Sequence, residues 1–559
     1  MEQKKVRDNW ASRMTFIFAS IGSAVGLGNA WRFPGLAATY GGGAFLLVYL
    51  IAMVIMGWPL LCMEIAIGRK TQKGAPGALY SINKKFEFVG WASVLNAFVI
   101  VCYYTVVLAW VIVMLFKSFK MGGLTAPEAG NLFITEVLTF KDIGAPGSMD
   151  VNAGMLWALL AAWVLMYLCI RKGAHSVGKV VKYTVIIPVV LLVILAINGM
   201  VKDIQVSSGA GLLTLLKPDF GKIVSEGKLA NLFIDAFGQV FYSLSIMMAI
   251  MVAYGSFVDK KSDIVKDTMI IAFSDFLISF LAGIVLFTTL SGTGMLEKYL
   301  ESPSGGVGTA FIVYPQAIVS LTNNSVVNGI FAFIFYMTLF TLAIDSAFSI
   351  VEGVSTAIAD KLHLNKRKTV IAVCMLAGVI SLVFASNSGL NWLDITDNMA
   401  NTFNLILVGI LECLTVGWFF DTKKIRSELN RTITPIKIGK KEVQWKIGAW
   451  YDWIIKILAP GILTVLIVWN FVTIFISYAK GEGGYGGYPI WAQVVAGWLV
   501  MAAVFIGAIV IQIVSRKNEK LRALDSTIKT WDEVHAEQEN EFIREELAKE
   551  AEMQEEAQK

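Results

Sequence analysis

The side chains that could do chemistry here are carboxyl groups placed where charge is most costly. Asp275 and Asp345 each stand near the middle of a long apolar segment, with no Lys or Arg close by. An ionisable group in hydrocarbon is expensive unless it is paired, hydrated or bound to an ion. Two such lone carboxylates indicate cation ligation or proton exchange inside a membrane.

Further polar side chains lie in or at the ends of apolar segments: Asn29, Glu64, Asp235, Gln239, Glu352, Asp397 and Glu412. For any one of them, the ordinary alternative is a helix-end residue that reaches the membrane interface. The set as a whole favours a function within the membrane over a chance collection of helix ends.

Two apolar segments are interrupted in a way that predicts broken helices. Residues 22–34 read GSAVGLGNAWRFP, and residues 236–249 are broken by an amide and by hydroxyls. A broken membrane helix is tolerated only where the gap is buried in protein or lines a wet cavity. Freed carbonyls could hold sodium there, and half-helix N-termini could face an anionic group.

The elements that must position these groups are membrane spans. The chain of 559 residues is 56% hydrophobic, with a mean hydropathy of +0.65, which excludes an ordinary soluble domain. Twelve segments are long enough to cross about 30 Å of hydrocarbon: 14–38, 43–69, 87–118, 153–170, 178–201, 230–257, 264–291, 327–360, 369–386, 396–420, 453–477 and 489–514. A shorter apolar piece, 307–321, is expected to fold back as a lid.

Basic residues gather in the connections on one side of the predicted membrane. They include Lys4, Lys5, Arg7 and Arg13 before the first span, and the runs 366–368 and 423–441 later. The positive-inside rule predicts a multi-pass protein of the cell's inner (plasma) membrane, with both termini cytoplasmic. The first segment has a charged front and no cleavage-type ending, so it is expected to be a span rather than a signal peptide.

Other parts of the sequence offer little chemistry. The five cysteines lie in apolar runs without metal-type spacing, and the three histidines lie near basic or polar connections. The pattern indicates no metal cluster, catalytic triad or nucleic-acid site, so an enzyme is not expected. The acid-rich tail is expected to be a solvated or partly disordered helix, with a regulatory partner site as the alternative.

The two interrupted segments are five spans apart. This spacing predicts an all-α integral membrane protein of 12 transmembrane helices, with two inverted five-helix repeats whose helices 1 and 6 are broken. The expected parts are an N-terminal segment carrying inner-gate residues (1–13), the repeats (14–201 and 230–420), the last two spans (453–514) and the tail (515–559).

The motif at 22–34, followed by GGGAF at 41–45 and PLLCMEIAIG at 59–68, resembles bacterial members of the neurotransmitter:sodium symporter family. The similarity runs through the first ten spans. It implies the leucine-transporter-like fold and sodium-coupled symport by alternating access, in which spans 1, 2, 6 and 7 rock.

The resemblance implies two sodium sites. The first would use Ala24, Asn29, Ser243 and Asp275 together with the substrate carboxylate, and the second would use Gly22, Val25, Leu342, Asp345 and Ser346. Oxygen ligands of this kind suit a hard cation. For the two serines alone, a bond back to the preceding helical turn is the alternative.

The resemblance also implies an amino-acid substrate. Relatives that carry monoamines place an acidic residue at position 26, where this chain has Gly26. The implied binding residues are Ala24, Leu27, Gly28, Ile100, Tyr104, Tyr242, Ser243, Ser245, Met248, Ser346, Ala347 and Ile350. Their apolar lining favours a neutral, hydrophobic side chain. The chain departs from the family at Met247 and Ala249, where glycine is usual, so a small or unusual substrate stays open.

Chloride is not expected as a cofactor. Chloride-dependent relatives hold the anion near a serine that matches Ser279, whereas here Asp275, one helical turn away, already supplies a negative charge. A second hypothesis is that Asp275 takes up a proton once sodium leaves, which would give proton counter-transport.

By resemblance, the outer gate would be an Arg32–Asp397 pair above Tyr104 and Tyr242, and Arg7, Trp10 and Asp360 would close the inside. The function predicted is a sodium-coupled amino-acid symporter. The alternatives are a non-transporting amino-acid receptor or sensor, or a transporter of another carboxylated amine or imine. The pattern does not indicate an oligomeric state.

Overall fold

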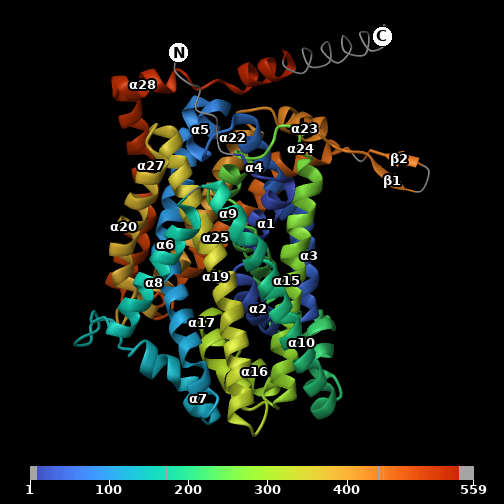
Figure 1. Ribbon diagram of the computed structural model, residues 1–559, viewed down its shortest axis with the longest axis vertical. Coiled ribbons are helices and arrows are strands. Elements are labelled where there is room, and N and C mark those ends of the chain that lie inside the picture. Colours follow the sequence, from blue (N-terminus) through green and yellow to red (C-terminus); the bar gives the residue numbers. More distant parts are fainter. Residues whose placement is uncertain (1–8, 172, 439–440, 445, 541–559) are drawn as a thin grey trace.

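The structure is a bundle of long, roughly parallel helices. The computed structural model describes residues 9–171, 173–438, 441–444 and 446–540. In Figure 1 the short helices α5 (Ala75–Ile82), α23 (Thr422–Arg431) and α28 (Glu519–Asp525) lie at one end of the bundle, which we call the α28 end. Helices α7 (Ala126–Leu132) and α16 (Leu296–Glu301) lie at the other, which we call the α16 end.

The predicted spans are present, several with π-helical turns (η) inside them. Spans 1 to 5 are α1 (Arg13–Ala24), η1 (Gly28–Arg32) and α2 (Phe33–Thr39); α3 (Gly43–Ala52), η2 (Met53–Gly57) and α4 (Trp58–Thr71); α6 (Glu87–Met121); α8 (Ala153–Ile170); and α9 (Ala174–Thr184) with α10 (Ile186–Ser207). Spans 6 to 10 are α13 (Leu229–Ser243) and α14 (Ile250–Gly255); α15 (Ile264–Gly292); α19 (Ser325–Lys361); α20 (Lys366–Phe384); and α21 (Gly389–Asp397), η6 (Asn398–Asn404) and α22 (Leu405–Gly417). Spans 11 and 12 are α24 (Trp450–Trp453), η7 (Ile454–Leu458) and α25 (Ala459–Ala479); and α26 (Ile490–Gln493), η8 (Val494–Trp498) and α27 (Leu499–Lys517).

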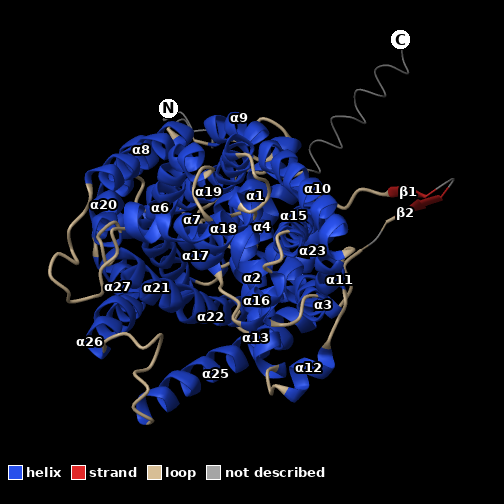
Figure 2. Ribbon diagram, turned by 90° about the horizontal axis from the view of Figure 1, so that it is seen from below, coloured by secondary structure: helices blue, strands red, loops and turns tan. Residues whose placement is uncertain are grey.

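Short elements connect the spans. They are η3 (Lys84–Phe86), η4 (Phe133–Val137), α11 (Ala210–Leu216), α12 (Phe220–Ser225), α17 (Gly306–Gly308), η5 (Thr309–Val313) and α18 (Tyr314–Val319). The apolar piece expected to fold back is the short helical segment Gly306–Val319. An antiparallel hairpin of β1 (Ile436–Ile438) and β2 (Lys441–Val443) pairs Ile436 with Val443 and projects from the bundle (Figure 2).

Ten helices of the described chain are long and apolar enough to cross a membrane, and one bent pair makes an eleventh. That pair is the broken first span, whose halves meet at 50°. Ser12 starts α1 by accepting a hydrogen bond from the Thr15 amide at 3.2 Å, and Val25 ends it with ψ of 101°. The twelfth predicted span is the interrupted pair α13 and α14.

The gap in span 6, residues 244–249, has a left-handed backbone at three residues that are not glycine. The φ angles are 51° at Ser245, 64° at Met247 and 61° at Ala249. Side chains disfavour this region, so neighbouring contacts must hold it. The Met247 amide donates to Glu64 Oε1 at 2.5 Å, and the Met247 carbonyl accepts from Ser93 Oγ at 2.9 Å.

The beginning of the C-terminal tail differs from the solvated helix that was expected. Lys361, at the end of α19, is almost fully buried and forms ion pairs with Asp525 at 2.7 Å and Glu87 at 3.2 Å. Trp531 is 3% exposed and packs edge-on against Phe420. This part of the tail therefore covers the α28 end of the bundle, whereas residues 541–559 lie outside the described chain.

Candidate functional site

The two broken spans meet around a small cavity of about 20 Å³. Ser245 Oγ, in the gap of span 6, donates to the Ser23 carbonyl of span 1 at 2.9 Å. The Leu27 amide donates to the Tyr104 hydroxyl of α6 at 3.4 Å. The lining residues are Ser23, Ala24, Gly26, Leu27, Gly28, Asn29, Ile100, Tyr104, Tyr242, Ser245, Met248, Ser346 and Ile350.

This lining brings together ten of the twelve residues predicted to bind substrate. Ser243 and Ala347 are the two that do not line the cavity; both are buried. The sequence reasoning missed Ser23, whose position inside the glycine motif was the available signal. The volume is about that of one water molecule, so an amino acid needs the surrounding side chains to move apart.

A side chain at Gly26 would require its neighbours to shift. A Cβ atom there would lie 2.5 Å from Ser346 Oγ and 3.2 Å from the Tyr104 hydroxyl. Since both contacts are polar, the space next to position 26 is bounded by hydroxyl groups. An acidic residue at this position would displace them, and the role of Gly26 in leaving room for a substrate carboxylate stays a prediction.

A buried polar cluster surrounds Asp275, one of the four residues predicted for the first sodium site. Asn29 Nδ2 donates to Asp275 Oδ1 at 2.7 Å and lies 2.9 Å from Ser243 Oγ. Ser243 Oγ donates to the same carboxylate, 2.7 and 2.6 Å from its two oxygens. Ala24 lies in the cavity lining beside Asn29. The carboxylate is fully buried, and its hydrogen-bond partners among the described residues are neutral.

Two further hydroxyl groups complete this cluster. Tyr49, on α3, donates to Asp275 Oδ2 at 3.0 Å. Ser279 Oγ, one turn along α15 from Asp275, accepts from Asn29 at 2.8 Å. Tyr49 was not predicted from the sequence, although a tyrosine inside the apolar run after GGGAF was a usable signal. The cluster therefore joins spans 1, 2, 6 and 7.

Asp345, predicted for the second sodium site, also faces the broken part of span 1. Its Oδ2 atom would lie 2.7 Å from a Cβ atom at Gly22. Its Oδ1 atom is buried and has no hydrogen-bond partner within the described residues. Ser346 Oγ lies 3.4 Å from both the Ser23 and the Leu342 carbonyls. An unpaired buried carboxylate oxygen of this kind has the chemistry of a cation ligand.

Val25, the last of the residues predicted for this second site, is the residue at which α1 ends. Its ψ of 101° takes the backbone out of the helix directly after Ala24. The carbonyls of Gly22 and Val25 therefore belong to the last turn of a half-helix, where backbone oxygens lack intrahelical partners. The joint role of Gly22 and Val25 as sodium ligands stays a prediction.

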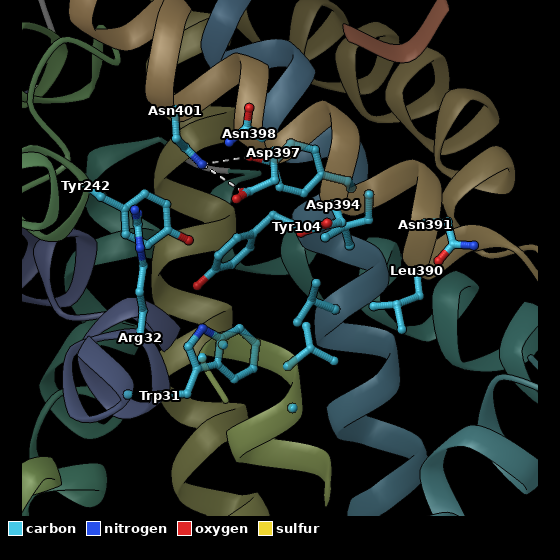
Figure 3. Close-up of a pocket in the computed structure, with 18 of the residues that line it drawn as sticks. Trp31, Arg32, Tyr104, Tyr242, Leu390, Asn391, Asp394, Asp397, Asn398 and Asn401 are labelled. Carbon is cyan, nitrogen blue, oxygen red and sulfur yellow. Dashed lines mark hydrogen bonds between the residues drawn. The ribbon is translucent and has the colours of Figure 1, made fainter. Parts of the chain in front are cut away.

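A larger cavity of about 590 Å³ lies on the other side of Tyr104 and Tyr242. It is lined by Arg32 and Asp397, the residues predicted for the outer gate. Figure 3 shows Arg32 beside Tyr242, with Asp397 on a different helix. The Arg32 guanidinium lies 5.4 Å from the Tyr242 ring centre. Asp397 instead accepts from Asn401 at 2.7 Å.

The expected Arg32–Asp397 ion pair is therefore absent from the described contacts of this conformation. The two groups nevertheless line the same cavity of about 590 Å³. The cavity also contains Asp394, which accepts from Tyr488 at 2.9 Å and from Tyr485 at 3.2 Å. Asp394, Tyr485 and Tyr488 were not predicted. The two tyrosines lie in the connection between spans 11 and 12, far along the chain from the other cavity residues.

The opposite side of the site is closed. Trp10 Nε1 donates to the Tyr254 carbonyl at 3.0 Å, and the Trp10 amide donates to the Phe257 carbonyl at 3.1 Å. Asp360 accepts from the Gly74 amide at 2.9 Å. Arg7, the third residue predicted for the inner gate, lies outside the described residues. The site is thus accessible from the α16 end, and Trp10 closes it toward the α28 end.

The sequence matches the model of the sodium:neurotransmitter symporter family over residues 7–136 and 123–519. An uncharacterised sodium-dependent transporter of Methanocaldococcus jannaschii is 33% identical over 509 residues, which cover 90% of this chain and 97% of that protein. The human sodium- and chloride-dependent creatine transporter 1 is 29% identical over 540 residues, 88% of this chain and 80% of that protein.

The fold has a solved counterpart. The crystal structure of MhsT in complex with L-phenylalanine aligns with a TM-score of 0.69 at 25% identity, covering 83% of this chain and 99% of that one. The chain therefore has the predicted leucine-transporter-like fold, with two inverted repeats and broken helices 1 and 6. Its relatives are transporters rather than enzymes. The protein is a multi-pass, sodium-dependent transporter of the sodium:neurotransmitter symporter family.

Proposed function

We propose that the protein is a symporter that couples sodium entry to uptake of a neutral amino acid with a hydrophobic or small side chain. The observation that carries the proposal is the pair of buried carboxylates, Asp275 and Asp345, each placed against the broken part of span 1. Buried charge of this kind is maintained where a cation binds. We assign one sodium ion to each carboxylate.

In this proposal the first ion lies among Ala24, Asn29, Ser243 and Asp275, and it also contacts the substrate carboxylate. The second lies among Gly22, Val25, Leu342, Asp345 and Ser346. The amino-acid side chain is held by Ile100, Met248 and Ile350, which line the small cavity. That MhsT was crystallised with L-phenylalanine supports an amino acid as the substrate class.

Transport would follow from alternating access to this one site. The 590 Å³ cavity lined by Arg32 supplies the outer route, and the contacts of Trp10 close the inner one. We place spans 1, 2, 6 and 7 in the moving bundle, spans 1–5 and 6–10 in the two repeats, and both termini on the cytoplasmic side of the plasma membrane. The bundle's four spans are those joined by the Asp275 cluster.

Chloride is not required in this proposal, because the Asp275 carboxylate already supplies the negative charge next to Ser279. Some relatives are named as sodium- and chloride-dependent, so independence of chloride needs its own test. Proteoliposomes loaded with potassium and diluted into sodium should take up amino acid equally in chloride and in gluconate. Loss of uptake in gluconate would contradict it.

The substrate is identified by a panel of amino acids in the same proteoliposomes, together with creatine and other carboxylated amines. Uptake that requires the sodium gradient supports a symporter. Sodium-dependent binding without uptake would instead support the alternative of a receptor or sensor on the same fold. Internal acidification that changes uptake or exchange would support proton counter-transport through Asp275.

A further inference from the structure

An apolar groove of about 550 Å³ lies outside the transport path, at the lipid-facing side of the bundle. It is formed by α6, α19, α20 and α27 and is separate from both cavities of the transport site. Its lining includes Trp91 and Phe98 of α6 and Ala372 and Leu376 of α20. Ala372 is exposed and Leu376 is 57% exposed, so the groove opens toward the surrounding hydrocarbon.

The groove has a polar mouth at one end only. Asn365 and Lys368 lie there, at the beginning of α20, and the lining contains no acidic residue. Asn365 caps α20 by accepting from the Lys368 amide at 3.3 Å. Lys368 is exposed and forms no ion pair with the described residues. Its neighbour Lys366 is already paired with Glu352 at 2.9 Å.

The length of the groove along α20 is close to the thickness of one leaflet of a bilayer. Its lining runs along α20 from Asn365 to Leu376, a distance of about 16 Å at 1.5 Å per residue. A hydrocarbon core is about 30 Å thick, so the groove spans roughly half of it. Its mouth is near the α28 end, because Lys361, at the end of α19, is paired with Asp525 of α28.

We propose that this groove binds a single anionic phospholipid of the leaflet at the α28 end. One acyl chain lies along Ala372 and Leu376, and the headgroup phosphate meets the Lys368 ammonium. An acyl chain satisfies the apolar lining, and an anionic headgroup complements a cation that has no carboxylate in its groove. Basic sites at the ends of transmembrane helices recognise lipid headgroups in this way.

A second groove on the same helix serves as an internal control. It measures about 560 Å³, lies between α8 and α20, and is lined by Leu160, Trp163, Met375 and other residues without a formal charge. Acyl chains can enter both grooves, but only the first offers a cation to the phosphate. Headgroup selectivity should therefore depend on Lys368 and on Ala372, and not on Met375.

The test uses the purified full-length protein and native mass spectrometry, with phosphatidylglycerol, phosphatidylethanolamine and phosphatidylcholine of identical acyl chains. The wild type should retain phosphatidylglycerol in preference to the other two. Lys368→Gln should reduce that preference roughly fivefold. Ala372→Trp should lower retention by filling the groove, whereas Met375→Trp should retain phosphatidylglycerol as the wild type does.

Equal retention of the three headgroups would overturn the proposal and indicate adventitious lipid only. So would Lys368→Gln binding phosphatidylglycerol as well as the wild type. A dimer that is lost in Ala372→Trp without any headgroup dependence would instead assign the groove to a second copy of the chain. If Ala372→Trp does not fold, the exposed Lys368→Gln substitution still decides the question.

Discussion

Asn29 and Asp275 join the broken part of span 1 to the middle of span 7 through a hydrogen bond of 2.7 Å. The Asn29 amide nitrogen faces the carboxylate, and the Asn29 amide oxygen accepts from the Gly26 amide at 3.0 Å. Ser243 and Tyr49 donate to the same carboxylate from spans 6 and 2. Residues of four spans therefore meet at one carboxylate. The charge at position 275 should determine which ions transport requires.

Asp275→Asn removes this charge while keeping the size of the side chain. We expect sodium-driven uptake to fall at least tenfold in gluconate and to recover in part when chloride is added, because an external anion can then replace the lost carboxylate. The measurement is uptake into proteoliposomes across a series of chloride concentrations. A variant that transports equally well without chloride would contradict the assignment. Ser279→Ala, which leaves the carboxylate in place, is the matched control.

The broken spans could be predicted from the sequence because each carries its own signal. Gly22, Gly26 and Asn29 interrupt an apolar run, and no lipid-facing helix tolerates such an interruption. The way in which span 6 unwinds could not be predicted. Met247 is held in a left-handed backbone by the distant residues Glu64 and Ser93, and long-range contacts of this kind have no signature in local sequence.

The gate illustrates a second limit of sequence reasoning. Arg32 and Asp397 line one cavity without forming the predicted ion pair, because their distance depends on the conformation of the whole bundle. Tyr485 and Tyr488, which donate to Asp394 in that cavity, belong to a glycine-rich connection far along the chain. Tertiary contacts bring them to the vestibule, so neither periodicity nor composition could assign them to it.

Arg32→Ala tests the outer gate. The guanidinium stacks near Tyr242 and forms no ion pair with Asp397 in the described structure, so its loss should cost the fold only about 0–1 kcal/mol. Substrate affinity should weaken roughly tenfold, because Tyr242 loses its partner above the cavity. Substrate-induced thermal stabilisation measures both quantities in one experiment.

Arg32→Lys is the control for that substitution, since it keeps the charge but loses the planar group that stacks on an aromatic ring. It should bind substrate with an affinity between those of Arg32→Ala and the wild type. Unchanged affinity combined with poor expression of Arg32→Ala would show that Arg32 serves the fold rather than the gate.

Ala249→Gly tests the backbone strain in span 6. Ala249 has φ of 61° and ψ of −4°, a left-handed conformation that costs a side-chain-bearing residue about 1–2 kcal/mol. Glycine removes that cost but loses about 0.5–1 kcal/mol in the unfolded chain. The thermal unfolding midpoint should therefore stay equal or rise slightly, which differential scanning fluorimetry can measure.

Two neighbouring substitutions sharpen this test. Ala253→Gly lies within α14, where glycine costs about 1 kcal/mol relative to alanine, so it should lower the midpoint. Ala249→Val places a β-branched residue in the left-handed region and should lower the midpoint more. If Ala249→Gly and Ala253→Gly are equally destabilising, the left-handed backbone at position 249 is not a source of strain.

Glu428 should hold the α28 end together. Its carboxylate lies 2.7 Å from Arg69 and 3.1 Å from Lys70, and all three side chains are almost fully buried. Glu428→Gln leaves two buried cations without their anion, a loss that typically costs roughly 3–5 kcal/mol. The thermal unfolding midpoint at pH 7 should fall clearly. Glu136→Gln, which breaks an exposed pair with Lys117, is the control and should change it little.

Glu428 should also make the stability of the fold depend on pH. Burial raises the pKa of the Glu428 carboxyl, but the charges of Arg69, Lys70 and Arg431 outweigh it and hold the pKa below its usual range. A pKa that is lower in the folded than in the unfolded state stabilises the fold at neutral pH, and that stability is lost as the pH falls below about 4.3. The wild type should therefore lose thermal stability on acidification more steeply than Glu428→Gln. Parallel losses in the two proteins between pH 5 and pH 3, measured by scanning fluorimetry in detergent, would contradict this assignment.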